Sequence, residues 1–571
     1  MKWILLFSFS LLSSVNIANA QFLEPDGGGS VDLPSDHLST EQRAEIMNQL
    51  EVNIDSLKKV GKLVKAGDID VRFSWPLRAE SHLFDYGYHG VSNFVDLNSG
   101  YPRQLKDYTC GTRTYDTDNG YNHAGTDFFT WPFAWNKMDN GEVAVVAGAP
   151  GVIIYSSDGN DDRSCSFNSR NWNAVYIQHS DGSVAWYGHL KRNSLTSKRV
   201  GEEVEEGEYL GIVGSSGNST GPHLHFELHD EDGAVVDPFK GSCNQIAGSL
   251  WKSQPDYYDS EINALRTHSS GPSFNQCPEP ETPNYKDGFL VGEEIVTTAY
   301  YRDQLQGQNT TYKIITPSET NFRSWNHASN EVPHYAASYW YWLNTLSSFA
   351  ETGLWKFEAQ FQGKSYSHYF TVSDPDTKPI PVYLQSPQND TGVTEETQLL
   401  RWLPLADADE YELLISKDEM FNNIVVSETS LLNREYVFGN LQSNNIYYWK
   451  VRARNTHGTG EWSQPRMFNT GLPVSIEEEE IIIPGEHILL QNYPNPFNPT
   501  TQISYKLSHT TRVELKVYNL LGEEVATLEN SQKRAGIHTV TFDASGLSSG
   551  IYYYSLRTTG FVEMKPMTLI K

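Results

Sequence analysis

Short runs in which apolar and polar residues alternate recur along most of this chain. Residues 355–361 form one such run, Gln362-Gly363 then supplies a turn, and residues 366–372 form a second run. Alternation with a period of two places every second side chain on the same face of a strand. With 571 residues the chain is too long for one core, so about three to five domains are expected. The sequence therefore predicts a mainly β protein with antiparallel sheets.

One segment near the N-terminus breaks this pattern and predicts a short helix. Residues 39–62 begin with Ser39 and Gln42, which fit a capping box, and a glycine triplet at 27–29 predicts a flexible lead before it. The apolar face of the helix contains Ile46, Met47, Leu50, Ile54 and Leu57. Two interpretations of this N-terminal helical segment, residues 21–70, stay open. It is a helix docked on the next domain, which base rates favour, or a prosegment that covers the active groove until its removal.

The first residues fit a secretion signal peptide, residues 1–20. Lys2 supplies the positive start, residues 3–12 are apolar, and Ala18-Asn19-Ala20 fits a small-x-small cleavage site. No later stretch reaches the roughly 18–20 apolar residues of a membrane helix, so no transmembrane segment is expected after signal removal. The formal net charge of -28 argues against nucleic acid as a partner, because like charges repel.

The four cysteines predict disulfide bonds. They are Cys110, Cys165, Cys243 and Cys277, and none lies in a C-x-x-C pair that would favour zinc-thiolate binding. An exported chain with an even number of cysteines favours bridges. Three pairings are possible, and the sequence leaves all three open.

Three segments carry residues typical of metal-assisted hydrolysis. They are His123-Ala124-Gly125-Thr126-Asp127, Trp186-Tyr187-Gly188-His189-Leu190 and Gly221-Pro222-His223-Leu224-His225-Phe226-Glu227-Leu228. On a strand, His223 and His225 face the same side. Leu224 and Phe226 face the other side and can anchor that strand in a core. The two imidazoles are therefore expected to face a groove.

A catalytic zinc ion takes about three protein ligands and keeps one position for water. His123 and Asp127 lie four residues apart around Gly125, which permits a tight turn, and His225 supplies a further nitrogen. We therefore predict one Zn²⁺ in this domain, bound by His123, Asp127 and His225. The helical H-E-x-x-H motif of other zinc peptidases is absent from the sequence.

Hydrolysis of a peptide bond also requires proton transfer and stabilisation of an oxyanion. Zinc lowers the pKa of its bound water to about 7, which gives a hydroxide nucleophile. His189 and His223 are the candidate catalytic residues. One can move the proton and the other can stabilise the developing charge, and the sequence does not decide which does which.

The region that contains these motifs, residues 71–245, resembles the lysostaphin-like (LytM-type) zinc metallopeptidases. Further points of likeness are Phe73-Ser74-Trp75-Pro76-Leu77, Val146-Ala147, Gly151-Val152, Leu210-Gly211 and the run from Gly214 to Gly221. The resemblance implies the same three zinc ligands and the same two helper histidines. It also implies an antiparallel β-sheet peptidase domain.

One stretch departs from that family. Residues 128–140, with Trp131, Phe133 and Trp135, are longer than the usual connection after the aspartate. These aromatic residues either reshape the rim of the groove or pack beneath the sheet, and the two interpretations are about equally favoured.

Three β-sandwich-like domains are expected after the peptidase domain. Residues 246–284 are expected to be a linker and residues 285–374 the first sandwich, where Trp340-Tyr341-Trp342 is either a sugar platform or, as base rates favour, core. Residues 379–472 resemble a fibronectin type III module.

The C-terminal part resembles an export signal of another kind. Residues 473–485 are expected to be an acidic linker, and residues 486–571, with the run Asn492-Tyr493-Pro494-Asn495-Pro496-Phe497-Asn498-Pro499, resemble the sorting domain of type IX secretion. This resemblance implies the type IX machinery as a partner. It also implies a protein secreted by, or attached to the outer-membrane surface of, a Gram-negative, Bacteroidota-like bacterium.

Together these features predict a secreted zinc-dependent endopeptidase that hydrolyses peptide bonds in bacterial peptidoglycan. The family implies stem-peptide cross-links or glycine-rich bridges as the substrate. The alternatives are an extracellular protease on glycine-rich proteins and a non-catalytic module that binds or regulates the wall. The sequence gives no oligomeric state.

Overall fold

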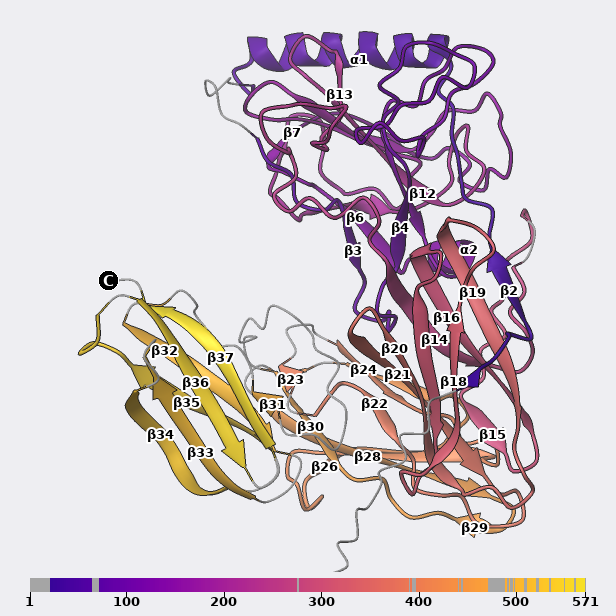
Figure 1. Cartoon of the computed structure of the whole chain (residues 1–571), viewed down its shortest axis with the longest axis vertical. Helices are drawn as coiled ribbons and strands as arrows, with labels where there is room; N and C mark the ends of the chain where they lie inside the picture. The colour runs from indigo at the N-terminus through magenta and orange to yellow at the C-terminus, as the bar shows by residue number, and fades with distance from the viewer. Residues whose placement is uncertain are drawn as a thin grey trace, which may run out of the picture.

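The computed structural model describes residues 21–569 apart from 64–70, 275–276, 390, 393–396, 440, 443–444, 471–487 and short stretches of the last domain. Those stretches are 490–491, 493–496, 498, 508–510, 520–522, 534–535, 549 and 559–560. The predicted signal peptide and acidic linker lie outside the described residues. The predicted mainly β, antiparallel fold is confirmed (Figure 1).

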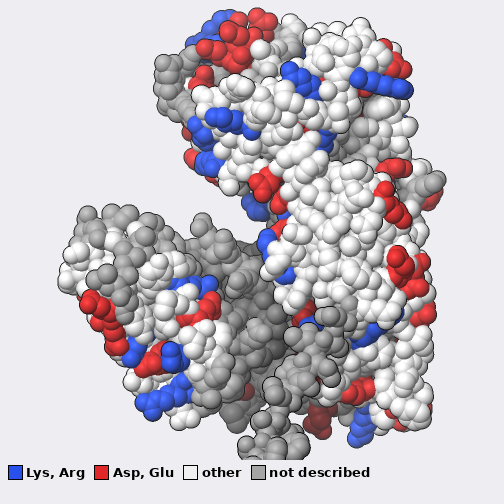
Figure 2. Space-filling view, viewed as in Figure 1, with Lys and Arg blue, Asp and Glu red and all other residues white. Residues whose placement is uncertain are grey.

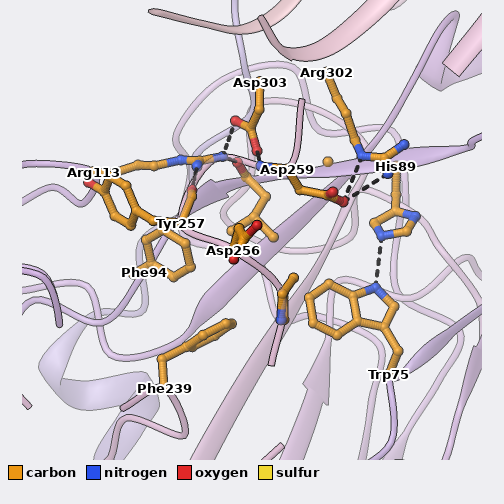
Figure 3. A pocket seen from close by; sticks show the side chains of 13 residues that line it. Trp75, His89, Phe94, Arg113, Phe239, Asp256, Tyr257, Asp259, Arg302 and Asp303 are labelled. Atoms are coloured by element: carbon orange, nitrogen blue, oxygen red, sulfur yellow. Dashed lines mark hydrogen bonds and ion pairs between the residues drawn. The ribbon is translucent and has the colours of Figure 1, made fainter. Parts of the chain in front are cut away.

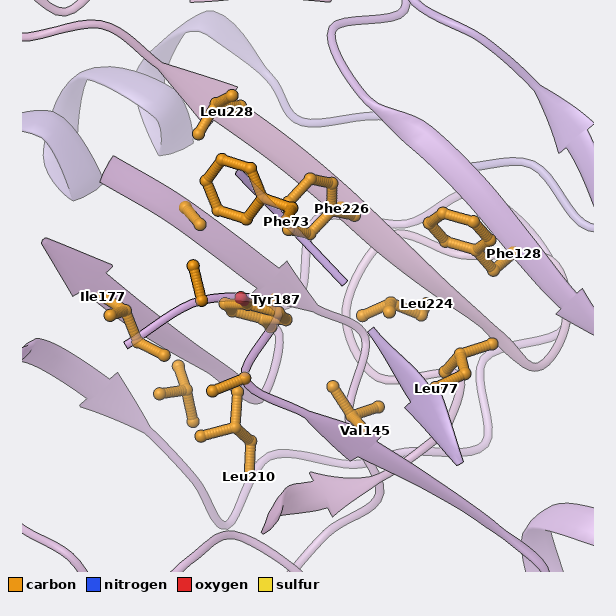
Figure 4. Packing of buried hydrophobic residues seen from close by; sticks show 14 of the residues in the cluster. Phe73, Leu77, Phe128, Val145, Ile177, Tyr187, Leu210, Leu224, Phe226 and Leu228 are labelled. Carbon is orange, nitrogen blue, oxygen red and sulfur yellow. The ribbon is translucent and has the colours of Figure 1, made fainter. Parts of the chain in front are cut away.

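The peptidase region is built on one large antiparallel sheet with strand order β10-β7-β8-β9-β12-β5-β4, to which β13 adds beside β12. Its strands are β4 (His89–Asn93), β5 (Thr126–Thr130), β7 (Gly151–Ser157), β8 (Ala174–Gln178), β9 (Val184–Gly188), β10 (Glu203–Val204), β12 (His223–His229) and β13 (Val235–Val236). A smaller sheet contains β3 (Leu77–Ala79), β6 (Val143–Val146) and β11 (Tyr209–Ile212). Side chains of both sheets, among them Val145, Leu210, Leu224 and Phe226, form the core (Figure 4).

The helix α1 (Thr40–Lys59) packs on the other face of the large sheet. The predicted capping box is confirmed, because Ser39 accepts a hydrogen bond from Gln42 N and the Gln42 side chain accepts one from Ser39 N. Leu50 and Leu57 of the predicted apolar face pack with Trp186 of β9. Because side chains alternate along β9, Trp186 packs under the helix, whereas the next residue, Tyr187, packs in the core between the two sheets.

The aromatic residues after β5 follow neither interpretation that the sequence left open. Trp131 and Phe133, just before the short helix α2 (Ala134–Asn140), are buried against Tyr300 of the next domain. The ring of Tyr300 meets both edge-to-face, with centroid distances of 5.7 and 5.8 Å. The insertion therefore builds an apolar interface between two domains.

A second contact between these domains is polar (Figure 3). Arg113 Nη2 of the peptidase domain lies 2.6 Å from Asp303 Oδ1, and both side chains are nearly buried. Beside this pair, Arg302 Nη2 lies 2.8 Å from Asp259 Oδ2. The Arg113–Asp303 pair crosses between the domains, and removal of either partner would leave a nearly buried charge unpaired.

The domain that follows is a sandwich of two sheets. One has the order β14-β16-β19-β2 and contains β14 (Glu261–His268), β16 (Glu294–Leu305), β19 (His334–Thr345) and β2 (Gly27–Ser30). The other, β1-β18-β17-β20-β21-β15, contains β1 (Gln21–Phe22), β18 (Asn321–Ala328), β17 (Asn309–Ile315), β20 (Gly353–Phe361), β21 (Lys364–Ser373) and β15 (Gly288–Leu290). Trp340 and Trp342 are buried in its core, as base rates favoured.

Two sequence interpretations are corrected here. Part of the expected linker 246–284 is strand β14, because Ile262 and Leu265 supply core side chains to the sandwich. The glycine triplet is not a flexible lead but strand β2, which pairs with β19. Gly27 packs so closely on Tyr341 that a side chain there would collide with the tyrosine ring, so glycine lets this strand approach.

Two further β domains complete the chain. The first contains β22 (Leu384–Ser386), β23 (Thr391–Gly392), β24 (Thr397–Trp402), β25 (Glu410–Ser416), β26 (Ile424–Leu431), β27 (Glu435–Gly439), β28 (Ile446–Asn455), β29 (Gly458–Thr459) and β30 (Arg466–Asn469). The second contains β31 (Ile488–Leu489), β32 (Thr500–Leu507), β33 (Thr511–Tyr518), β34 (Glu524–Lys533), β35 (Gly536–Asp543), β36 (Gly550–Thr558) and β37 (Phe561–Leu569). Each has two sheets around its own core.

The structure also shows which cysteines are bonded. Cys110 pairs with Cys243, and Cys165 pairs with Cys277. The second bridge ties the peptidase domain to the connection between β14 and β15 of the sandwich. Among the described residues, no helix combines the length and apolar character needed to cross a membrane.

In the view of Figure 2, both signs of charge lie together around α1.

Truncation of Tyr300 should weaken the packing between the two domains and lower the stability of the protein. The Tyr300→Ala variant is expected to lose about 3–5 kcal/mol of unfolding free energy, because it leaves a cavity beneath Trp131 and Phe133. Urea denaturation followed by tryptophan fluorescence measures the change. Phe349→Ala is the control, since Phe349 is 95% exposed, and equal stability of the two variants would contradict the interface.

Candidate metal-dependent active site

The strand β12 gathers the residues that the sequence singled out. His225 lies opposite Asp127 of β5 and opposite Gly188 of β9, which precedes His189. The structure thus brings together all five predicted positions, His123, Asp127, His189, His223 and His225, and all are buried. The predicted alternation on β12 is present, because Leu224 and Phe226 enter the core while the histidines face away from it.

Three of these side chains converge on one point. Asp127 Oδ1 lies 3.0 Å from His123 Nε2 and 3.0 Å from His225 Nδ1. Together with Asp36, their ligand atoms lie within 4.8 Å of one another. Two imidazoles and a carboxylate at this spacing form the donor set that zinc prefers.

The hydrogen bonds on the far sides of the rings favour a metal at this point. His123 Nδ1 bonds the Phe94 carbonyl at 2.8 Å, and His225 Nε2 donates to Glu227 Oε2 at 3.1 Å. His123 Nε2 is buried and, although Asp127 Oδ1 lies 3.0 Å away, it makes no hydrogen bond with the described residues. Oriented imidazoles with one nitrogen free toward a shared centre are typical of metal ligands.

The glycine between the first two ligands has a role beyond the predicted one. A Cβ at Gly125 would lie 2.6 Å from His225 Nε2. The chain bends at this residue, where the sequence predicts a tight turn, and glycine is also required because the His225 ring occupies the space of a side chain.

The two helper histidines lie side by side, with ring centroids 4.5 Å apart. His189 Nδ1 bonds the Ser216 carbonyl at 2.6 Å, and His223 Nδ1 bonds the Gly221 carbonyl at 2.8 Å. Burial and the neighbouring His189 lower the pKa of His223 to about 4. His223 is therefore neutral near pH 7, with an Nε2 lone pair that can accept a proton.

Asp36 is a site residue that the sequence did not indicate. Its Oδ2 lies 2.9 Å from His189 Nε2 and 3.0 Å from His225 Nδ1, and its Oδ1 lies 3.9 Å from His123 Nε2. Burial by itself would raise the pKa of this carboxyl. The contacts with His225 and His189 lower the pKa by more, so it lies well below its ordinary value. Asp36 lies far from the motifs in sequence, which explains why no spacing pattern reveals it.

Tyr115 is a second residue that sequence reasoning missed. Its ring stacks on His123 with centroids 4.6 Å apart, and its hydroxyl donates to Asp36 Oδ1. Burial and Asp36 raise the pKa of the Tyr115 hydroxyl well above its ordinary value, so it stays a donor. The hydroxyl therefore donates to the carboxylate that lies beside His123, His189 and His225.

Glu227 supports the centre from behind. It shares the histidine face of β12, where it accepts hydrogen bonds from His225 Nε2, from His229 Nε2 at 2.6 Å and from Arg43 Nη2 at 3.0 Å. Burial raises the pKa of Glu227, but Arg43 and the histidines lower it well below its usual range. Its place two residues after His225 could have signalled this contact, because residues two apart share a face.

Comparison with known families agrees with this geometry. Residues 122–238 match peptidase family M23, residues 389–473 match the N-terminal immunoglobulin domain of Rha78A-like proteins, and residues 491–568 match a secretion system C-terminal sorting domain. The segment predicted to resemble fibronectin type III is thus an Ig-like domain.

Known relatives share only the peptidase segment. The peptidoglycan DD-endopeptidase ShyC of Vibrio cholerae is 42% identical over 13% of this chain and 17% of its own length. The DD-carboxypeptidase/endopeptidase Mpg of Neisseria meningitidis is 51% identical over 12% of this chain and 14% of its own length. The glycyl-glycine endopeptidase ALE-1 of Staphylococcus capitis is 34% identical over 19% of this chain and 25% of its own length.

These shares mean that the chain spans at most a quarter of the length of those three relatives. Among solved structures, the FN1–FN3 domains of chicken CNTN1 match 49% of this chain and 95% of that one, with 10% identity and a TM-score of 0.14. The sorting domain indicates a secreted or cell-surface Bacteroidota protein. The chain thus carries a peptidase domain of family M23, followed by an Ig-like domain and a C-terminal sorting domain.

Proposed function

We propose that this protein is a zinc-dependent endopeptidase that hydrolyses peptide bonds in bacterial peptidoglycan. The observation that carries the proposal is the convergence of His123, Asp127 and His225 on one point, with two further histidines beside it. When bound there, zinc would supply an activated water and polarise the scissile carbonyl.

The protein's own residues would divide the remaining work. His223 Nε2 is buried, has no hydrogen-bond partner among the described residues and belongs to a neutral ring, so it would accept the proton of the water and pass it to the leaving nitrogen. His189 Nε2 and the Tyr115 hydroxyl face the same space and would donate to the oxyanion. The hydrogen bonds to the Ser216 and Gly221 carbonyls would keep both helper rings in place.

Peptidoglycan is the favoured substrate because the relatives' names point there. ShyC is a peptidoglycan DD-endopeptidase, and ALE-1 is a glycyl-glycine endopeptidase. Stem-peptide cross-links and glycine-rich bridges are accordingly the two candidate bonds. The sorting domain would place the enzyme outside the cell, where such walls are reached, and would make the type IX machinery its export partner.

A protease on glycine-rich extracellular proteins remains the second candidate, since the glycyl-glycine activity named for ALE-1 needs no sugar in its substrate. A module without catalysis is disfavoured, because all five positions of the site are filled and brought together. Incubation with purified peptidoglycan beside a glycine-rich protein separates the two active candidates. Mass spectrometry of the released fragments is expected to show peptides from the peptidoglycan alone.

Replacing one predicted ligand and one predicted helper should have different effects. His225→Ala is expected to weaken zinc binding at least ~100-fold, because the site loses a nitrogen and the contact to Glu227. His223→Ala is expected to keep zinc and lose about 10²–10⁴-fold in kcat. Metal content is measured by mass spectrometry on dialysed protein, and turnover by peptide release.

His457→Ala is the control, because this histidine is exposed in the Ig-like domain. Full zinc content and wild-type turnover in His225→Ala would show that the metal assignment is wrong.

Tyr115→Phe tests the proposed oxyanion donor. The loss of the hydroxyl is expected to lower kcat by about 10²-fold and to change KM little, because the donor acts mainly in the transition state. Zinc content should stay unchanged, since the ring still stacks on His123. A change in KM alone would assign the hydroxyl to substrate binding instead.

A further inference from the structure

His189, one of the two helper histidines, lies in a backbone conformation that side chains rarely adopt. It follows directly on strand β9, and its φ is 62°. A residue other than glycine keeps this left-handed conformation only where the surrounding structure enforces it. The contacts around His189 therefore decide where its imidazole ring lies.

Asn173, the last residue of the connection between β7 and β8, holds the chain beside His189. The Asn173 carbonyl accepts a hydrogen bond from Leu190 N at 2.9 Å, and Asn173 Nδ2 donates to the Leu190 carbonyl at 3.1 Å. Asn173 N donates to Ser216 Oγ at 2.8 Å, and the carbonyl of the same serine accepts from His189 Nδ1. Asn173, which is fully buried, thus fixes both the peptide group after His189 and the residue that orients its ring.

Trp172 supports the same ring from the side. Its indole packs edge-to-face against the imidazole of His189, with ring centroids 4.9 Å apart, and its Nε1 donates to the Tyr176 hydroxyl at 2.8 Å. A Cβ at Gly188 would lie 2.4 Å from the Trp172 ring, so glycine before His189 lets the indole approach. The β7–β8 connection, residues 158–173, therefore forms one wall of the site.

The rest of this connection is attached to the loop that contains Ser216. Ser164 N donates to the Ser215 carbonyl at 3.1 Å, and Ser215 Oγ donates to the Ser164 carbonyl at 2.7 Å. The next residue, Cys165, is bonded to Cys277 in the connection between β14 and β15 of the sandwich. The disulfide thus joins the sandwich domain to the wall of the site.

The helix α2 makes a second link between the sandwich and the chain around His189 (Figure 1). Near the start of the helix, Asn136 N donates to Glu281 Oε2 of the sandwich at 3.2 Å. At its end, Lys191 Nζ donates to the Met138 carbonyl at 2.8 Å. Lysine at a helix C-terminus satisfies carbonyls that have no partner within the helix. Lys191 lies two residues after His189, so this contact anchors the chain that leaves the site.

The same helix also contacts the β7–β8 connection. Arg163 of the connection forms an ion pair with Asp139, and its guanidinium lies 5.0 Å from the centroid of the Trp135 ring. The insertion after β5 therefore contacts both segments that fix His189. It is itself held on the sandwich by Glu281 and by the packing of Trp131 and Phe133 against that domain.

We propose that the sandwich domain is part of the catalytic apparatus: through α2 and the Cys165–Cys277 bridge it holds the β7–β8 connection, which keeps His189 in the position that oxyanion stabilisation requires. Asn173 and Lys191 are positioning residues in this arrangement, because they act through His189. The inference rests on the proposed endopeptidase function. A misplacement of a catalytic group by 1 Å can cost about 10²-fold in rate, so such support matters for turnover.

Removal of the bridge tests the proposal. In the full chain, Cys165→Ser/Cys277→Ser is expected to lower kcat on peptidoglycan at least ~10-fold, with KM and zinc content unchanged, because only His189 is displaced. Cys110→Ser/Cys243→Ser is the matched control. The two bridges have similar sequence separations, 112 and 133, so their removal destabilises the fold to a similar degree, but Cys243 lies beside Tyr108 and not beside the wall of the site. Equal kcat in the two double variants overturns the proposal.

Hydrogen exchange, followed by mass spectrometry, examines the same variants without reference to activity. Residues 158–173 and 186–192 are expected to exchange at least ~10-fold faster in Cys165→Ser/Cys277→Ser than in the control, because their support on the sandwich is lost. Equal exchange in the two variants also overturns the proposal. Absence of peptidoglycan hydrolysis by the wild type instead overturns the proposed function, and hydrogen exchange still decides whether the sandwich supports the wall.

Lys191→Met tests the contact with α2 and leaves both disulfides intact. Methionine keeps an apolar stem but gives no hydrogen bond to the helix, so kcat is expected to fall about 3–10-fold at unchanged KM. Lys191→Arg, which can still donate to the carbonyl, should restore kcat. Lys198→Met is the control, because Lys198 Nζ donates to the Glu203 carbonyl at 2.7 Å on the surface. An equal effect of the two methionine variants on kcat overturns the role of α2.

Discussion

The alternation of side chains on β12 is the constraint on which the rest of the structure depends. Leu224, Phe226 and Leu228 enter the core between the two sheets, and this fixes the strand in rotation and register. His223 and His225 are then obliged to face the other way. A shift of one residue would exchange the faces, burying imidazoles among apolar side chains and exposing the core residues.

The same constraint explains why the site has layers. Behind His225, on the same face of β12, Glu227 accepts a hydrogen bond from His225 Nε2 and is itself held by His229 and Arg43. On the other side of the point, Asn93 donates to Asp127 Oδ2 at 3.1 Å and leaves Oδ1 toward the histidines. A cluster of imidazoles and carboxylates out of water requires such contacts, because each unpaired polar group would destabilise the fold. The hydrogen bonds with Glu227 and Asn93 offset the loss of hydration when His225 and Asp127 are buried.

The N-terminal segment makes the peptidase domain and the sandwich one unit. Its strands complete sheets of the sandwich, its middle lies in the site and its helix covers the large sheet. The insertion after β5 also joins the peptidase domain to the sandwich, since Trp131 and Phe133 pack against Tyr300. The helix is docked on the large sheet, as the first interpretation of the helical segment expected, and the prosegment interpretation stays a prediction.

The sequence by itself determined the mainly β class, the capped helix and the faces of β12, because each follows from spacing over a few residues. It also named five side chains that the fold brings together, since their motifs contain the residue types that zinc chemistry needs. Only the tertiary structure decided that Asp36, Tyr115 and Arg43 join them, that Gly125 makes room for a ring, and that strand β14 lies where a linker was expected. Those contacts join segments that are far apart in the chain. The spacing of residues within one short segment carries no information about which distant segment will pack against it.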